Sequence, residues 1–259
     1  MKLLSLLFAA LVLAGCSSGP RIDNSHPSVN HDNRVQFVVV HYTSTNMDNS
    51  LRLLTRGQVS SHYLIGDNNP ATLYQLVDES QRAWHAGESE WRGRTWLNSS
   101  SIGIEIVNPG FRDTPAGRVW YPYSEAQVQA LIVLLKDIVK RNNIEPRDVI
   151  GHSDIAPLRK QDPGPLFPWK RLAAEGLGVW PDEQAVMRQQ EVYAYQLPSP
   201  TWFQQQLQYL GYSTPQTGEW DVATRHVLAA FQMHFRPARF DGVADAQSAA
   251  ILQVLNQSK

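Results

Sequence analysis

Phe37-Val38-Val39-Val40 is a continuous apolar run, and it is followed at once by His41. A short strand without polar alternation is typical of a sheet that is covered on both faces. The stretch Ile102-Gly103-Ile104-Glu105-Ile106 alternates instead, which places three isoleucines on one face and Gly103 with Glu105 on the other. We therefore expect one face of this second strand to lie in the core and the other to face a cleft.

Weaker sequence patterns predict further strands and one long helix. Three further segments are strand candidates: residues 62–65, 72–77 and 149–151. The last of them leads directly into His152. Ser124-Glu125-Ala126-Gln127 is a capping-box signature, and apolar residues then recur at helical spacing as far as Val139. Strands interleaved with helices predict an α/β domain, with a central mixed β-sheet flanked by helices, over residues 34–180.

The last part of the chain has a different pattern. A Gln-rich stretch with little periodicity predicts an interdomain linker over residues 181–199. Ser199-Pro200 has the order of a helix cap followed by proline in the first turn, and Asp221 and Asp245 precede two further helical stretches. Residues 200–257 are therefore predicted to form a small three-helix bundle.

Composition narrows the class of protein. The 259 residues are 42% hydrophobic and 18% charged, enough for one ordinary core and a second, smaller one. The 23 Lys and Arg nearly balance the 24 Asp and Glu, so the chain has no basic field to gather phosphates, and we expect no nucleic-acid partner. A single cysteine excludes an internal disulfide. As a separate expectation, we take the protein to be a monomer.

The first residues resemble an export signal. Met1 and Lys2 precede an apolar stretch of 13 residues, which is too short for a membrane-spanning helix of about 20 residues. We expect residues 1–15 to be a signal peptide that is removed. Residues 16–33 are polar with almost no apolar side chains, and we expect them to form a lipidated tether.

Lipidation is suggested by the end of this stretch. Leu13-Ala14-Gly15-Cys16 resembles a bacterial lipobox, which implies that Cys16 carries acyl chains such as palmitate and is the first residue of the mature protein. Two buried chains already suffice for stable anchoring. Ser17 resembles the outer-membrane sorting pattern, so we expect a membrane partner through this lipid and a protein that faces the periplasm. The alternative is a plain secretory signal with an unmodified Cys16.

Two histidines differ from the other six because each stands at the end of an apolar strand. Strand ends present side chains to a crevice, where His41 and His152 could meet. His152 is followed eight residues later by Lys160 and ten residues later by Asp162, which begins the sequence Asp-Pro-Gly.

These motifs resemble the zinc-dependent N-acetylmuramoyl-L-alanine amidases of the type-2 amidase family. Val59-Ser60-Ser61-His62-Tyr63 also matches, and the resemblance covers residues 35 to 178 or so. It implies the type-2 amidase fold, one Zn²⁺ ion, and a set of site residues with known roles. The implied zinc ligands are His41, His152 and Asp162, with Glu105 as catalytic base and Lys160 as stabiliser of the transition state.

Zinc-dependent hydrolysis of an amide requires the same residue types. Two imidazoles and one carboxylate leave a fourth tetrahedral position open, which is the catalytic pattern for zinc. Zinc lowers the pKa of a bound water to about 7. An uncoordinated carboxylate such as Glu105 can take the water's proton, and an ammonium such as Lys160 can stabilise the negative charge that collects on oxygen.

The resemblance further implies a peptidoglycan hydrolase that cleaves the amide between N-acetylmuramic acid, or its anhydro form, and L-alanine of the stem peptide. Peptidoglycan and muropeptides are the implied partners. The C-terminal pattern over residues 200–256 resembles a three-helix peptidoglycan-binding domain. It departs from that domain in the basic and aromatic loop of residues 235–240, whose alternative role is packing against the catalytic domain.

Simpler interpretations exist for each residue alone. Asp162 can cap a turn, Lys160 can be a solvated loop charge, and Glu105 can pair with Arg92 or Arg94. For all of these simpler interpretations to hold at once, four separated motifs would have to match the family by coincidence. His62 and His85 could touch substrate or support the zinc ligands, but a structural role fits them at least as well. Trp84, Trp91 and Trp96 could stack on sugar rings, but core or lid packing fits any one of them better. His226 and His234 are expected to be satisfied or exposed histidines of the bundle.

Three alternative functions stay open at this point. A non-catalytic peptidoglycan-recognition protein has the same fold. An iron oxygenase is suggested by His152-x-Asp154 with a distant His226, which imitates a facial triad of two histidines and one carboxylate. An endopeptidase would cut within the stem peptide instead.

Overall fold

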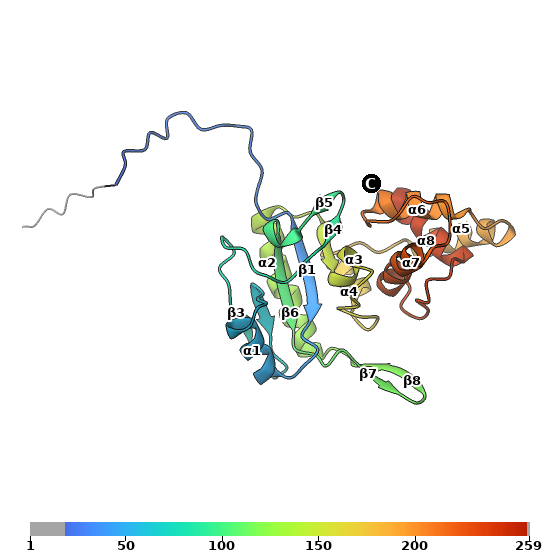
Figure 1. Cartoon of the computed structure of the whole chain (residues 1–259), viewed down its shortest axis with the longest axis horizontal. Coiled ribbons are helices and arrows are strands. Elements are labelled where there is room, and N and C mark those ends of the chain that lie inside the picture. The colour runs from blue at the N-terminus through green and yellow to red at the C-terminus, as the bar shows by residue number, and fades with distance from the viewer. Residues whose placement is uncertain (1–18, 258–259) are drawn as a thin grey trace, which may run out of the picture. The chain divides into compact units, whose positions relative to one another are not determined.

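The computed structural model of the chain describes residues 19–257 (Figure 1). The chain divides into two compact units, Met1–Asp32 and Asn33–Lys259. In the first unit, residues 19–32 are exposed and form no helix or strand. The expected signal peptide and the expected lipidation site at Cys16 lie outside the described residues.

A mixed sheet forms the centre of the second unit, and within the described residues it has five strands. They lie in the order β3-β2-β6-β1-β9, and neighbours are parallel except for β3, which runs antiparallel to β2. The strands are β1 (Phe37–Tyr42), β2 (Tyr63–Ile65), β3 (Leu73–Gln75), β6 (Ser101–Ile106) and β9 (Val149–Gly151). The predicted α/β fold with a central mixed sheet is confirmed, and the strand expected at residues 72–77 is shorter than predicted.

The central strands are covered on both faces, which explains their apolar sequences. Val38, Val40 and Ile104 belong to a core that they share with helix α2 (Glu125–Asn142). Val39, on the opposite face of β1, belongs to a second core that also contains residues of the C-terminal helices. The sheet therefore lies between α2 and the C-terminal part of the chain.

Helix α2 begins at the capping box that its sequence predicts. Ser124 accepts a hydrogen bond from the backbone N–H of Gln127, and the Gln127 side chain accepts one from the backbone N–H of Ser124. The helix continues beyond Val139 and ends at Asn143, whose φ of 54° is left-handed. Asparagine tolerates that conformation, so it can close a helix.

Several short elements were not predicted from the sequence, and all of them except α1 lack a periodic apolar pattern. One of them, the β7–β8 hairpin, extends away from the sheet in Figure 1. The elements are α1 (Met47–Arg56), the hairpin β4 (Glu90–Trp91) and β5 (Arg94–Thr95), the hairpin β7 (Phe111–Thr114) and β8 (Gly117–Trp120), α3 (His152–Ile155), α4 (Trp169–Ala174), and 3-10 turns at Leu97–Ser99 and Pro146–Asp148.

Residues 200–257 contain the three expected helices, and an unexpected helix precedes them in the described C-terminal part. In chain order, these helices are α5 (Glu183–Tyr195), α6 (Pro200–Leu210), α7 (Val222–Phe235) and α8 (Ala246–Gln257). Ser199 and Asp221 cap α6 and α7 as predicted. The expected linker of residues 181–199 instead contains α5, which is capped by Asp182 and packs along α8.

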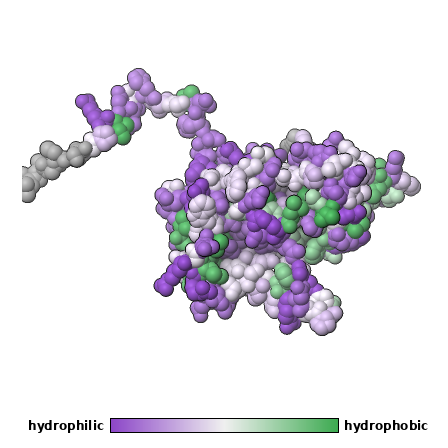
Figure 2. All heavy atoms as spheres, viewed as in Figure 1, coloured by the Kyte–Doolittle hydropathy of each residue, from purple (hydrophilic) through white to green (hydrophobic). Residues whose placement is uncertain are grey.

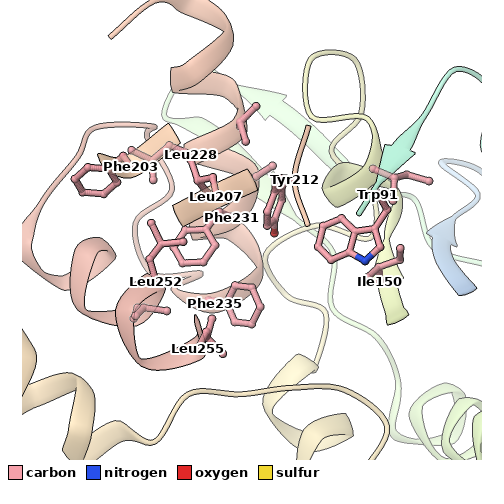
Figure 3. Packing of buried hydrophobic residues seen from close by; sticks show 14 of the residues in the cluster. Trp91, Ile150, Phe203, Leu207, Tyr212, Leu228, Phe231, Phe235, Leu252 and Leu255 are labelled. Atoms are coloured by element: carbon pink, nitrogen blue, oxygen red, sulfur yellow. The ribbon is translucent and has the colours of Figure 1, made fainter. Parts of the chain in front are cut away.

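The C-terminal helices share a core with the sheet domain (Figure 3). Tyr212 lies between Phe231 of α7 and Trp91 of β4, with ring centroids 6.1 Å and 5.0 Å from its own. The Tyr212 hydroxyl donates to Oδ1 of Asp154 over 2.6 Å, and Nδ1 of His234 lies 2.8 Å from Oδ2. Because Asp154 belongs to α3, the C-terminal helices hold that short helix directly.

The face of this unit seen in Figure 2 is mainly polar. Figure 2 shows hydrophilic residues over most of the visible face, with hydrophobic residues in small separate groups. Among residues 19–257, no helix combines the length and the apolar character needed to cross a bilayer.

We expect Leu135→Ala to lower the free energy of unfolding by about 2–5 kcal/mol, because Leu135 is fully buried in the core between α2 and the sheet. Urea unfolding followed by circular dichroism measures this loss. Val133→Ala is the matched control on the same helix, since Val133 is 64% exposed, and its effect should stay within about 0.5 kcal/mol. Equal losses in the two variants would contradict this core.

Candidate metal and catalytic site

Two neighbouring strands end at one edge of the sheet, and each brings a histidine there. His41 lies near the carboxyl end of β1, and His152 follows β9 as the first residue of α3. Val40 pairs with Gly151 in the parallel register, so the two histidines that follow lie side by side. Both imidazoles are buried, with 1% and 4% of their surface exposed.

Asp162 brings a carboxylate to the same point. Its Oδ2 lies 3.0 Å from Nδ1 of His41 and 3.0 Å from Nδ1 of His152, and the two Nδ1 atoms are 2.9 Å apart. The backbone N–H of Ser153 donates to the Asp162 carbonyl over 2.8 Å, which ties the loop to α3. The carboxylate thus contacts two imidazoles and does more than cap a turn.

The three side chains fit a divalent cation. Burial, reinforced by the nearby His152, lowers the pKa of His41 to about 4, so its ring is neutral at pH 7. Burial would raise the pKa of Asp162, but His152 and His41 outweigh it and hold that pKa well below its usual range. One ligand atom from each residue lies within 4.8 Å of the others. Two imidazoles and one carboxylate are the donor types of a catalytic zinc site.

Glu105 stands beside this cluster on the next strand. It pairs with His41 in the register of β6 and β1. Its Oε2 is buried and has no hydrogen-bond partner among the described residues. Burial, together with the charge of Asp162 and against that of Lys160, raises the pKa of Glu105 to about 8. An unsatisfied buried carboxyl is costly for a fold, which is typical of a functional group.

No structural ion pair accounts for Glu105. The guanidinium of Arg92 donates to both carboxylate oxygens of Asp148, at 3.1 and 3.0 Å. Arg94 donates to the side-chain oxygen of Gln36. The alternative pairings that the sequence left open are therefore not formed.

Lys160 is half-buried on the loop that leads to Asp162. Its backbone N–H donates to the Ala156 carbonyl over 3.0 Å, which continues the turn after α3. The positive charge of Lys160 lowers the pKa of Glu105 and of His41, so it acts on the site electrostatically.

His85 is a site residue whose role the sequence left open. It is buried, and its Nδ1 lies 3.0 Å from Nε2 of His41. The carbonyl of Ala86 lies 3.1 Å from Nε2 of His152. Gly103 lies on the same strand as Glu105, and a Cβ at Gly103 would come within 2.4 Å of the His85 ring. The glycine makes room for the histidine.

Other candidates have structural surroundings. His62 is buried, and its Nδ1 accepts a hydrogen bond from the Gly103 backbone while Nε2 lies 3.3 Å from the Gln81 carbonyl. Trp91 is buried in the shared core. Trp84 and Trp96 are exposed.

The iron-triad alternative is not assembled. Both carboxylate oxygens of Asp154 are already bonded, to Tyr212, to His234 and to the backbone N–H of Gly151. His226 is exposed on α7. His234 is buried and stacks on Trp169 at 3.9 Å between centroids, so it is a satisfied structural histidine as predicted.

The C-terminal part contributes to the rim of the site. A cavity of about 300 Å³ lies beside Lys160 and is also lined by Leu158, His226, Met233 and Phe240. Phe240 contacts Trp120 of β8 at 6.2 Å between ring centroids. The basic and aromatic loop thus packs on the catalytic domain, which was the alternative role considered for it.

Comparisons with known proteins agree with this geometry. Residues 31–165 match the family described as N-acetylmuramoyl-L-alanine amidase. The chain is also 43% identical to N-acetylmuramoyl-L-alanine amidase AmiD of Escherichia coli K12, over 96% of this chain and 95% of that protein. The chain belongs to the N-acetylmuramoyl-L-alanine amidase family. Residues 196–252 match a putative peptidoglycan binding domain.

Solved structures of this amidase family superimpose closely. The complex of E. coli AmiD with the substrate anhydro-N-acetylmuramic acid-L-Ala-D-gamma-Glu-L-Lys has a TM-score of 0.84 at 42% identity, covering 92% of this chain and 95% of that one. AmpDh3 of Pseudomonas aeruginosa in complex with anhydromuramic pentapeptide has a TM-score of 0.85 at 41% identity, covering 92% and 98%. The type-2 amidase fold is confirmed.

We predict that Glu105 makes the metal-free protein less stable as the pH rises. Its pKa is about 8 in the fold against 4.5 for the unperturbed group, so its contribution is present below about pH 4.5 and is lost as the pH rises to about 8. Glu105→Gln cannot ionise, so it should gain about 1.4 kcal/mol or more on wild type between about pH 5 and about pH 8.

Urea unfolding in the presence of a chelator at those two pH values measures the gain. Glu88→Gln, at an exposed position, is the matched control and should follow wild type. The same pH dependence in Glu105→Gln and wild type would contradict the raised pKa.

Proposed function

We propose that this protein is a zinc-dependent peptidoglycan amidase. It hydrolyses the amide between N-acetylmuramic acid, or its anhydro form, and L-alanine of the stem peptide. The observation that carries the proposal is the convergence of His41, His152 and Asp162 on one point, with the unbonded carboxyl of Glu105 beside them. The names of the AmiD and AmpDh3 complexes support the substrate class.

His41, His152 and Asp162 would hold one zinc ion. When bound, zinc supplies a Lewis acid that activates water and polarises the amide carbonyl. The three protein ligands leave a position open for water or substrate. Their burial keeps competing water away and strengthens electrostatic interactions in the site.

Glu105 acts as the general base and then as the general acid. It takes a proton from the attacking water and passes it to the departing amine nitrogen. Catalytic groups work best with a pKa near the working pH, and burial moves the pKa of Glu105 in that direction. A cation held by Asp162 and the two histidines would lower this pKa toward neutrality.

Lys160 stabilises the negative charge that develops on the carbonyl oxygen. This role is supported by its charge, which lowers the pKa of Glu105 and of His41. Loss of one such donor typically costs about 10²- to 10³-fold in turnover.

The domains divide these tasks. Residues 34–180 form the zinc amidase domain, residues 181–199 connect it, and residues 200–257 form the peptidoglycan-binding part. Binding of the polymer by a linked module raises the local concentration of substrate at the catalytic site. The basic loop adds little free charge for this, because Arg236 pairs with Asp245 and Arg239 with Asp241.

The protein acts on the cell wall from a membrane anchor. We propose that residues 1–15 are removed, that Cys16 is lipidated, and that residues 16–33 are the tether of a monomeric protein. The lipid places the enzyme on the outer membrane, facing the periplasm, where peptidoglycan is within reach.

The proposed activity predicts specific products from purified peptidoglycan. Stem peptides that are intact and free of sugar should appear in mass spectra, a chelator should abolish them, and added zinc should restore them. Glu105→Gln should keep zinc and lose about 10²- to 10⁴-fold in turnover. Shortened peptides still joined to sugar would indicate an endopeptidase. Muropeptides that are bound by the zinc-loaded protein but left uncut would indicate a recognition protein of the same fold.

The proposed anchor predicts that Cys16→Ala abolishes the incorporation of labelled palmitate and leaves the hydrolytic activity of the protein unchanged. Ser17→Ala is the matched control, since it keeps the thiol and should still be labelled and sediment with membranes. Palmitate incorporation into Cys16→Ala would disprove lipidation at this residue.

A further inference from the structure

Two adjacent residues, His85 and Ala86, contact Nε2 of both candidate ligand histidines. Nδ1 of His85 lies 3.0 Å from Nε2 of His41, and the carbonyl of Ala86 lies 3.1 Å from Nε2 of His152. His41 lies on β1 and His152 begins α3, whereas their contacts come from adjacent residues of one loop. This loop therefore acts on both imidazoles at once.

The hydrogen-bond chain through His85 determines where the protons lie. Ser101 Oγ donates its only proton to the Leu97 carbonyl over 2.6 Å. At the 3.2 Å contact with Nε2 of His85, Ser101 Oγ must therefore accept, so this nitrogen carries a proton. Nδ1 of His85 is then an acceptor in the neutral ring, and Nε2 of His41 is the donor to it.

His152 reaches the same state by a different partner. The Ala86 carbonyl can only accept, so Nε2 of His152 carries the proton. Both Nδ1 atoms then turn lone pairs toward Oδ2 of Asp162, at 3.0 Å from each. Three acceptors face one another without a donor among them, which is the arrangement that a cation satisfies.

The segment is itself held in place. The side-chain oxygen of Asn98 accepts the backbone N–H groups of both His85 and Ala86, at 3.0 and 2.7 Å. The guanidinium of Arg159 donates to the Ala86 carbonyl as well. Asn98 and His85 are buried, and so is Ser101, so these hydrogen bonds are shielded from water.

We propose that Ser101, His85 and the Ala86 carbonyl are a positioning device that holds both ligand imidazoles in the Nε2-protonated form. Nδ1 of each ring is thereby kept free for zinc before the ion arrives. Partners of this kind orient metal ligands, and their loss typically weakens metal affinity about 10- to 100-fold. The inference rests on the proposed function, since it names what sets the zinc affinity of that site.

The test is the zinc dissociation constant of the purified protein, measured by competition with a chelating dye. We expect His85→Ala to weaken zinc binding about 10- to 100-fold, because Nε2 of His41 loses its acceptor. Ser101→Ala should weaken it about threefold or more, and Ser101→Thr, which keeps the hydroxyl, should restore it. Because the two residues act in series, the double variant should bind zinc as weakly as His85→Ala alone.

Gln204→Ala is the matched control, because Gln204 is a buried polar residue whose hydrogen bonds to Thr217, Glu219 and Thr224 lie within the C-terminal part, away from His85 and the zinc ligands. It should lose thermal stability and keep its zinc affinity within about twofold. Zinc affinity in His85→Ala within about twofold of wild type would overturn the proposal, and so would fully additive losses in the double variant. If wild type binds no zinc, the proposed function itself fails.

Discussion

The site depends on two imidazoles and one carboxylate that the fold forces together. Nδ1 of His41, Nδ1 of His152 and Oδ2 of Asp162 lie 2.9 to 3.0 Å apart in a buried position. Polar atoms this close are costly to bury unless a proton or a cation lies between them, so the surrounding structure must supply the free energy that holds them. The parallel pairing of β1 with β9 fixes the histidines, and the bond from Ser153 to the Asp162 backbone fixes the carboxylate.

The central part of the fold could be predicted because its residues repeat with a strong period. The isoleucines of β6 and the capping box at Ser124 are examples, and both are found as expected. Helix α5 escaped prediction because it packs at the edge of the C-terminal helices, and of its residues only Val186 is fully buried. Such a narrow apolar stripe is diluted by glutamines and resembles a linker.

The site, like the fold, could be predicted only in part. His41 and His152 stand at strand ends, where elementary rules place side chains that meet. The alternation of residues 102–106 predicts that Glu105 faces a cleft, whereas the roles of Lys160 and Asp162 could be predicted only from family resemblance. His85 lies in a loop with no periodic pattern, so nothing local marks it, and only the folded chain brings it to His41.

The junction between the two parts has a mechanical consequence. Asp154 is bonded to Tyr212 and His234 from the C-terminal side, two residues after His152, and the aromatic core around Tyr212 is continuous. The helices and the metal site should therefore turn as one rigid body. A peptidoglycan strand bound by these helices would therefore be cut at a fixed distance from the position where it is bound. Such an enzyme would select strands whose repeat brings a stem peptide to that distance.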